Sequence, residues 1–276
     1  MSGEIISSWD GYTWYIEGDN DRLVLNDGEM TVRTILQKLS RLDRVFVDVG
    51  AHVGEYAIRM AYYYHKVIAI EPIPRSVRIL KKNIELNHIA NIEVKQVACS
   101  DKEEVLTFRL RGGSSTALEM QGKFNVIKVK AVRLDDLVEW CDVIKIDVEG
   151  WEEKVVKGAS NLIEKCKPVI VIEHHEFRGY DSCKGMKERI IKMLSGYRHF
   201  NLNGIHTLYV PESFNIEEVK DAIVYHWVMK AIKNLEQGKP WYYGMPKTWW
   251  YGGHITDFML ALPEHILKEK TWIEKL

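Results

Sequence analysis

The stretch V-D-V-G-A-H-V-G-E-Y-A (47–57) gives the strongest indication of fold in this sequence. It continues V-F-V-D-V (45–49), a nearly continuous apolar run that is typical of a strand buried on both faces of a parallel sheet. Gly50 permits a tight turn and a close approach of the backbone to a ligand, and Gly54 permits close packing where a helix starts. We therefore expect a buried strand, a glycine loop and a helix over residues 54–64.

Outward from this stretch, strand-like segments alternate with helix-like segments between residues 43 and 210. Pro74 stands where a helix would begin, because its fixed φ suits the first helical turn. The segments 106–110 and 126–132 alternate polar and apolar residues and should pair with each other. The other strands are expected at 45–49, 67–71, 92–98, 142–147 and 169–173, and the helices at 54–64, 74–87, 134–140 and 155–164. This order predicts an α/β fold, a doubly wound Rossmann-like sheet with helices on both faces.

Residues 1–42 form a short lead-in before the main domain. Two strands are expected at 13–16 and 22–25, around the turn-forming G-D-N-D (18–21). Residues 29–39 have helical spacing of apolar side chains. We therefore expect a hairpin followed by a helix before the main domain, which we place at residues 43–210.

Residues 211–276 form an aromatic-rich C-terminal extension. Helical spacing is expected at 217–235 and 255–267. The aromatic side chains are a small core, a contact for a homo-oligomer, or a stacking platform above an acceptor pocket. They are Trp227, Trp241, Tyr242, Tyr243, Trp249, Trp250, Tyr251 and Trp272.

Composition excludes several classes of protein. The 276 residues carry a formal net charge of −1, so no global field draws the chain to nucleic acid or to an anionic membrane. The N-terminal residues lack the basic and apolar regions of a signal peptide, and no window approaches the ~18 apolar residues that a membrane span needs. The cysteines fit neither a zinc site nor a disulfide framework, and they are Cys99, Cys141, Cys166 and Cys183. We expect a soluble, cytoplasmic protein with free thiols.

The glycine loop and the end of the second strand together predict a nucleoside site. Glu71 stands 23 positions after Asp48, where a carboxylate is placed to accept hydrogen bonds from ribose hydroxyls, and Pro72 fixes the exit of the chain. The loop lacks the middle glycine of the dinucleotide fingerprint and the Lys of a P-loop. S-adenosylmethionine (SAM) has no phosphate and tolerates the Ala and His of this loop, so SAM is the expected cofactor.

A third strand end, V-A-C-S-D (97–101), should lie near the adenine. There Asp101 or a neighbouring backbone group could bind the adenine amino group. The full set of expected cofactor-binding residues is Asp48, Gly50, His52, Gly54, Glu71, Pro72, Ser100, Asp101 and Asp147.

These motifs resemble the FkbM family of SAM-dependent methyltransferases over about residues 26–177. The most specific combination is the loop at 45–56 with V-R-L-D-D-L (132–137) and I-K-I-D-V-E-G-W-E (144–152). The resemblance implies the seven-stranded class I methyltransferase sheet and transfer of a methyl group from SAM, usually to a hydroxyl oxygen and often on a sugar. His52 stands where Asn is common in the family. The tail beyond about residue 200 has no counterpart in the resemblance, so the identity of the acceptor cannot be carried over from the family.

The ends of the fourth and fifth strands supply the expected catalytic groups. An alcohol needs a base to become a good nucleophile, and His is best matched in pKa. We expect His174 or His175 to be that base, with Asp147 and Glu149 orienting substrate or cofactor. No metal site is assigned, although these side chains and Glu173 could instead bind a divalent ion.

The leading hypothesis is therefore an O-methyltransferase acting on a saccharide or a small glycosylated molecule. A protein or RNA methyltransferase is the second reading, although D-V-E-G-W (147–151) replaces the N-P-P-[YF]-like motif of enzymes that methylate base amines. A non-catalytic SAM-binding interaction protein is the third. We expect no membrane partner and no nucleic-acid partner.

Overall fold

The computed structural model describes residues 3–25, 29–111, 114–117, 125–178 and 183–223, and a few single positions beyond them. At its centre is a seven-stranded sheet in the order β12-β13-β11-β10-β3-β4-β5. β13 is antiparallel to both of its neighbours, and the other pairs are parallel. The strands are β3 (Val45–Val49), β4 (Lys66–Ile70), β5 (Ile92–Lys95), β10 (Val143–Ile146), β11 (Val169–Glu173), β12 (Tyr197–Asn201) and β13 (His206–Pro211). The expected α/β class and the expected seven-stranded sheet are thus confirmed.

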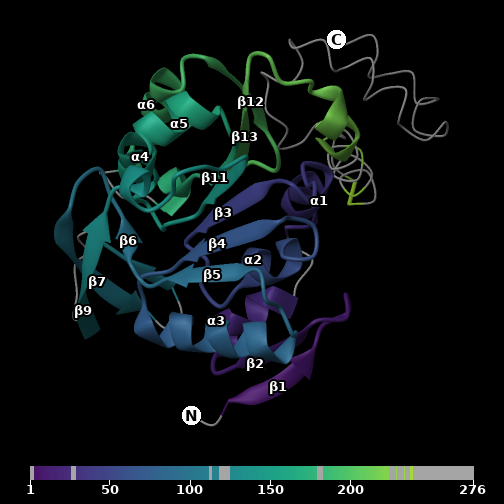
Figure 1. The fold of residues 1–276 in the computed structure, drawn as a ribbon, viewed down its shortest axis with the longest axis vertical. Coiled ribbons are helices and arrows are strands. Elements are labelled where there is room, and N and C mark those ends of the chain that lie inside the picture. The colour runs from purple at the N-terminus through teal and green to yellow at the C-terminus, as the bar shows by residue number, and fades with distance from the viewer. Residues whose placement is uncertain are drawn as a thin grey trace.

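Helices cover both faces of this sheet. They are α1 (Met30–Lys38), α2 (Glu55–Met60), α3 (Pro74–Leu86), α4 (Glu152–Gly158), α5 (Ser160–Cys166) and α6 (Met186–Met193). In β3, Phe46 packs in the cluster that holds side chains of α1, α2 and α3, whereas Val47 packs with those of α4, α5 and α6. Alternating side chains of one strand therefore build two separate cores. Figure 1 shows α4, α5 and α6 together on one side of the sheet and α3 on the other.

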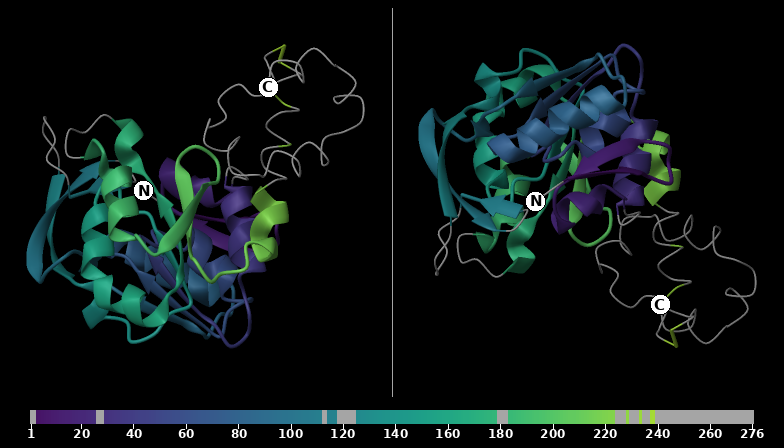
Figure 2. Two further views of the ribbon diagram at one scale, coloured as in Figure 1. Left: turned by 90° about the horizontal axis from the view of Figure 1, so that it is seen from above. Right: turned by 90° about the horizontal axis from the view of Figure 1, so that it is seen from below.

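A second, four-stranded sheet stands beside the first one. It has the order β6-β9-β7-β8, with β6 (Ala98–Cys99), β7 (Glu104–Arg111), β8 (Ser114–Thr116) and β9 (Asn125–Val132). The expected pairing of 106–110 with 126–132 is confirmed. The expected strand 92–98 is wrong in its last part, because Val97 turns back to donate to the Lys95 carbonyl, and the chain then pairs with β9. Figure 2 shows these strands apart from the purple N-terminal elements.

The lead-in contains a hairpin, but not the expected one. β2 (Thr13–Ile16) pairs with β1 (Glu4–Ser7), and the segment expected as a second strand lies in the 3₁₀ helix η1 (Asp19–Leu25). Asp21 explains the difference: its backbone N–H donates to the Gly18 carbonyl and its buried carboxylate accepts the Glu17 N–H. Such local bonds compete with a strand ladder. The helix expected at 29–39 is confirmed as α1.

Two further helical expectations are corrected. The helix expected at 155–164 is two helices, which meet at Ala159. The segment 134–140 holds only the short 3₁₀ helix η2 (Leu134–Asp136). The Asp135 carboxylate in η2 accepts the backbone N–H of Leu162 and so caps α5 as a separate helix.

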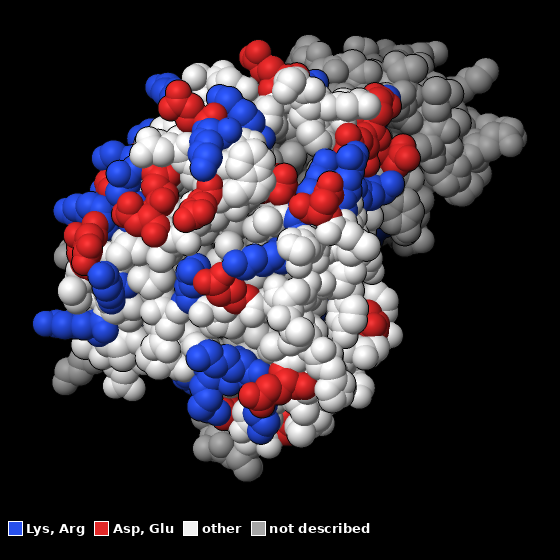
Figure 3. Space-filling model, in the orientation of Figure 1, with Lys and Arg blue, Asp and Glu red and all other residues white. Residues whose placement is uncertain are grey.

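Little of the C-terminal extension falls within the described residues. Residues 217–223 are helical, as expected. The aromatic side chains from 241 to 272, and the helix expected at 255–267, lie outside the described residues. Within the described part of the chain, no helix has the length and hydropathy to cross a lipid bilayer. On the face in Figure 3, Lys and Arg side chains alternate with Asp and Glu among the described residues, as the net charge of −1 suggests.

Candidate active site

A cavity of about 320 Å³ opens at the carboxyl ends of β3, β4, β10 and β11. This is where ligands bind in open α/β sheets. One half is lined by the glycine loop, the end of β4 and the third strand end. The other half is lined by carboxylates, one lysine and one histidine. The lining residues used below are Glu29, Gly50, His52, Glu55, Tyr56, Glu71, Pro72, Val97, Ala98, Cys99, Phe108, Lys145, Asp147, Glu149, Trp151, Glu173 and His175.

The loop after β3 can turn only because of its glycines. Gly50 has a φ of +89°, and a Cβ there would lie 1.7 Å from the carbonyl oxygen of Asp147. Its N–H donates to the Ile70 carbonyl. The loop is therefore held against the ends of β4 and β10 at once. Gly54, with a φ of +103°, brings α2 close to Leu80 of α3, since a Cβ would lie 2.6 Å from its Cδ1.

Glu71 is the anchor of the nucleoside half. Its Oε2 accepts the N–H of His52 and its Oε1 accepts the N–H of Ile73, each at 2.9 Å. A carboxylate has about four acceptor sites, so two remain for hydroxyl donors. The side chain lines the cavity and is buried. Burial raises the pKa of Glu71 to about 7, although the two N–H bonds oppose this shift.

His52 and Asp48 flank this anchor in different ways. His52 lines the cavity with a φ of +49°, and its Nε2 lies 3.6 Å from the Asp21 carboxylate. Burial lowers the pKa of His52. Asp48 does not line the cavity: it is buried beneath the loop, 4.0 Å from the Lys145 Nζ, and burial raises its pKa to about 6.

Lys145 joins the two halves of the cavity from below. Only 2% of its side chain is exposed, and its Nζ lies 3.3 Å from an oxygen of Asp147. The Nζ also lies 4.4 Å from the centre of the Tyr56 ring, within reach of a cation–π contact. Burial alone would lower the pKa of Lys145, but Asp147 and Asp48 raise it above its ordinary value. The lysine therefore stays charged and balances these carboxylates.

His175 is the centre of the other half. Its Nδ1 lies 2.7 Å from the buried carboxylate of Glu152, and its Nε2 lies between 3.5 and 3.7 Å from oxygens of Asp147, Glu149 and Glu173. Burial alone would lower the pKa of His175, but the Glu152 hydrogen bond and the neighbouring carboxylates raise it to about 9. At neutral pH this ring is therefore an imidazolium.

Five of the expected site residues lie outside the cavity: Asp48 and Gly54, described above, and His174, Asp101 and Ser100. His174 points to the opposite face of β11, where its Nε2 bonds the hydroxyl of Tyr209 at 3.1 Å. Asp101 is held by Lys154 and Lys157 of α4, each at 3.0 Å. Ser100 is buried and donates its hydroxyl proton to Glu104. Gly50, His52, Glu71, Pro72, Asp147, Glu149 and His175 do line it.

Several lining residues carried no assigned role in the sequence interpretation. Glu55 and Tyr56 belong to the same quoted loop motif, and Trp151 belongs to the D-V-E-G-W motif, so their proximity to the motifs was the available signal. Phe108 comes from β7, and nothing in its local sequence indicates that the second sheet covers the cavity. Burial, and then Glu29, raise the pKa of Glu55 to about 7.

The FkbM methyltransferase domain matches residues 48–201, more than half of the 276 residues. The chain belongs to the FkbM methyltransferase family. It is 27% identical over 152 residues to the hexuronic acid methyltransferase AglP of Haloferax volcanii, covering 53% of this chain and 63% of AglP. It is 26% identical over 174 residues to the methyltransferase sdnD of Sordaria araneosa, covering 48% of this chain and 67% of sdnD.

Solved structures are similar at lower identity. An FkbM methyltransferase from Methylobacillus flagellatus is 20% identical with a TM-score of 0.44, covering 62% of this chain and 44% of that one. Trm5b from Pyrococcus abyssi is 15% identical with a TM-score of 0.47, covering 76% of this chain and 55% of that one. The assignment to the FkbM family depends on the family match and not on these solved structures.

Proposed function

We propose that this FkbM protein binds SAM in the half of the cavity that contains Gly50 and Glu71. It methylates a saccharide hydroxyl in the other half, which contains Asp147, Glu149, Glu173 and His175. The observation that carries the proposal is that one cavity joins a nucleoside cradle to a cluster of hydrogen-bond acceptors. The name of AglP, a hexuronic acid methyltransferase, adds support for a sugar acceptor.

The nucleoside half fits an adenosyl group. The two free acceptor sites of Glu71 suit the two ribose hydroxyls. Beyond it, apolar side chains of the third strand end and the aromatic rings of Phe108 and Trp151 line a space suited to a flat adenine ring. When bound, SAM would supply an electrophilic methyl group on its sulfonium, with S-adenosylhomocysteine as the leaving group. The residues of the loop would set its position.

The acceptor half suits a polyhydroxylated molecule. Asp147, Glu149 and Glu173 present carboxylate oxygens that accept hydrogen bonds from neighbouring hydroxyls. The same charges oppose a phosphate backbone, because among the lining residues only Lys145 is a permanent cation and it is already paired. This favours a saccharide over RNA as the acceptor.

Glu55 is the best-matched base for the acceptor hydroxyl. A pKa of about 7 lets this half-buried carboxylate accept a proton near neutral pH. His175 was the expected base, but a pKa of about 9 keeps it protonated. We therefore propose that His175 holds the acceptor oxygen or its neighbouring carboxylates in place, while Glu55 takes the proton.

The first test is SAM affinity by isothermal titration calorimetry. Glu71→Gln should weaken SAM binding by roughly 10-fold to 100-fold, since it removes charge-assisted hydrogen bonds. Glu85→Gln, the same change on the exposed side of α3, should leave the affinity unchanged. Equal affinity in both variants, or no binding to the wild type, contradicts the cofactor site.

The second test is transfer to a panel of acceptors, measured as S-adenosylhomocysteine release. The panel holds neutral saccharides, a hexuronic acid, a peptide and an RNA oligonucleotide. Release is expected with a saccharide, and Glu55→Gln should lower kcat by about 10²-fold or more with SAM affinity retained. Release with RNA or peptide alone overturns the acceptor class. The cytoplasm remains the proposed compartment, because the four cysteines, which all lie in the described part of the chain, form no disulfide there.

A further inference from the structure

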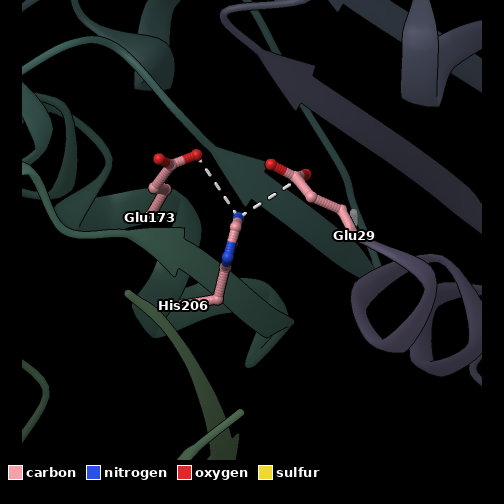
Figure 4. A group of neighbouring side chains, drawn as sticks. All are labelled: Glu29, Glu173 and His206. Carbon is pink, nitrogen blue, oxygen red and sulfur yellow. Dashed lines mark ion pairs between the residues drawn. The ribbon is translucent and has the colours of Figure 1, made fainter. Parts of the chain in front are cut away.

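A second group of ligating side chains lies at the edge of the cavity and shares only Glu173 with the proposed acceptor half. Glu29 comes from the start of α1, Glu173 ends β11 and His206 begins β13. One donor atom of each lies within 4.8 Å of the other two. Figure 4 shows the ring of His206 pointing between the two carboxylates.

The distances are long for hydrogen bonds but suit ligands around a metal ion. The Nε2 of His206 lies 3.4 Å from an oxygen of Glu173 and 3.7 Å from an oxygen of Glu29. Metal–ligand bonds of about 2.1 Å in tetrahedral geometry separate neighbouring ligands by about 3.4 Å. The group is therefore already close to the spacing that a bound cation would impose.

An independent observation points to a ligand here. His206 is fully buried, and its Nε2 has no hydrogen-bond partner among the described residues. Its Nδ1 lies 3.2 Å from Oδ1 and 3.0 Å from Nδ2 of Asn203. The tautomer with its proton on Nδ1 donates to that Oδ1 and leaves the lone pair of Nε2 directed at the carboxylates. A hydrogen bond from the ring nitrogen that does not bind the metal orients most metal-bound histidines.

We propose that Glu29, Glu173 and His206 bind one divalent cation of the Mn²⁺ or Zn²⁺ type. One imidazole with two carboxylates suits these ions, whereas Mg²⁺ and Ca²⁺ prefer oxygen ligands alone. Three protein ligands leave further coordination positions open. Glu29 and Glu173 both line the cavity, so those positions face it and the ion can enter from there.

The proposed metal site lies where the start of α1 meets the end of β11 and the start of β13. Glu29 also accepts a hydrogen bond from the hydroxyl of Tyr56, which fixes one of its oxygens beside α2. Glu173 and His206 face each other in the β11–β13 register. A bound ion therefore connects α1, β11 and β13 at the rim of the cavity. It also offsets the negative charge of the carboxylates there.

The test measures Mn²⁺ and Zn²⁺ binding to the full chain, without SAM or acceptor. Titration calorimetry, with metal content after dialysis as a second readout, should give one ion per chain. Glu29→Gln and His206→Gln should each weaken binding at least tenfold. His199→Gln, the same change at an exposed position of the neighbouring β12, should leave binding unchanged. SAM affinity serves as the check that each variant is folded.

A competing group decides where the ion lies. Asp147, Glu173 and His175 also bring ligand atoms within 4.8 Å of one another. If His175→Gln removes the ion and His206→Gln does not, the proposal is overturned. Absence of binding to the wild type also overturns it and makes the group a buried ion pair. Neither result touches the proposed methyl transfer, because SAM binding is measured separately.

Discussion

The two halves of the cavity are built in different ways. The nucleoside half is local and uses the backbone: Glu71 accepts N–H groups of His52 and Ile73, and the Gly50 N–H bonds the end of β4. The acceptor half is assembled from the side chains of distant elements, with His175 facing carboxylates that come from the loop after β10, from the start of α4 and from the end of β11.

This difference has a physical consequence. A site held by backbone hydrogen bonds depends on whether the chain can turn, and a steric change should damage it most. A site held by buried charges depends on balance, since each carboxylate needs a cation or a proton. We expect a steric change in the loop to cause the largest loss of stability, and the removal of a buried charge to cause a smaller loss that depends on pH.

The largest effect is expected for Gly50→Ala. Its new Cβ would overlap the Asp147 carbonyl, and a φ of +89° is strained for any L residue. We predict a loss of about 4 kcal/mol in the free energy of unfolding, measured by urea denaturation. Gly204→Ala is the matched control: its φ is +103° but nothing lies within 4 Å of its Cβ position. A similar loss in both variants would mean that φ strain, and not the close approach, controls the loop.

A smaller loss, about 3 kcal/mol, is expected for Lys145→Met. The change leaves Asp48 buried without its cationic neighbour. The pKa of Asp48, already raised to about 6, should rise further. A group whose folded pKa is raised loses stability as pH rises, so the deficit should be larger at pH 8 than at pH 5.5. Lys81→Met, at an exposed position of α3, should show neither the loss nor its pH dependence.

Sequence patterns predicted five of the seven strands of the central sheet, but they did not predict β12 and β13. They failed where one side chain or one turn decided the outcome. The segment 22–25 has strand-like residues, but the bonds of Asp21 hold it in η1. The segment 92–98 reads as one strand, but the turn at Val97 sends its end into another sheet. Hydrophobic periodicity predicts neither the hydrogen bonds of Asp21 nor the turn at Val97.

The site follows the same division. Gly50 and Glu71 were predictable, because they are close in sequence and their spacing reflects one strand–helix–strand unit. Glu29 and His206 come from elements that meet only once the sheet order is known. His174 is instructive: Ile170 and Ile172 pack on the α4–α6 face, so alternation already directs His174 away from the cavity.

The smallest predicted effect is the pH dependence of SAM binding. Glu71 has a raised pKa of about 7 in the free protein, because it is buried. Ribose hydroxyls donate to its ionised form, so binding lowers this pKa and releases a proton. Affinity should therefore increase from pH 6 to pH 8, by up to about tenfold, or about 1.4 kcal/mol.

Variants separate Glu71 from its neighbours in this measurement. Glu71→Gln should bind SAM weakly but equally at both pH values. Glu55→Gln should keep the full pH dependence, although burial raises the pKa of Glu55 to about 7 as well, since that carboxylate is assigned to the acceptor side. If the dependence survives in Glu71→Gln and disappears in Glu55→Gln, the adenosyl group sits in the half that we assign to the acceptor. The division of the cavity would then be reversed.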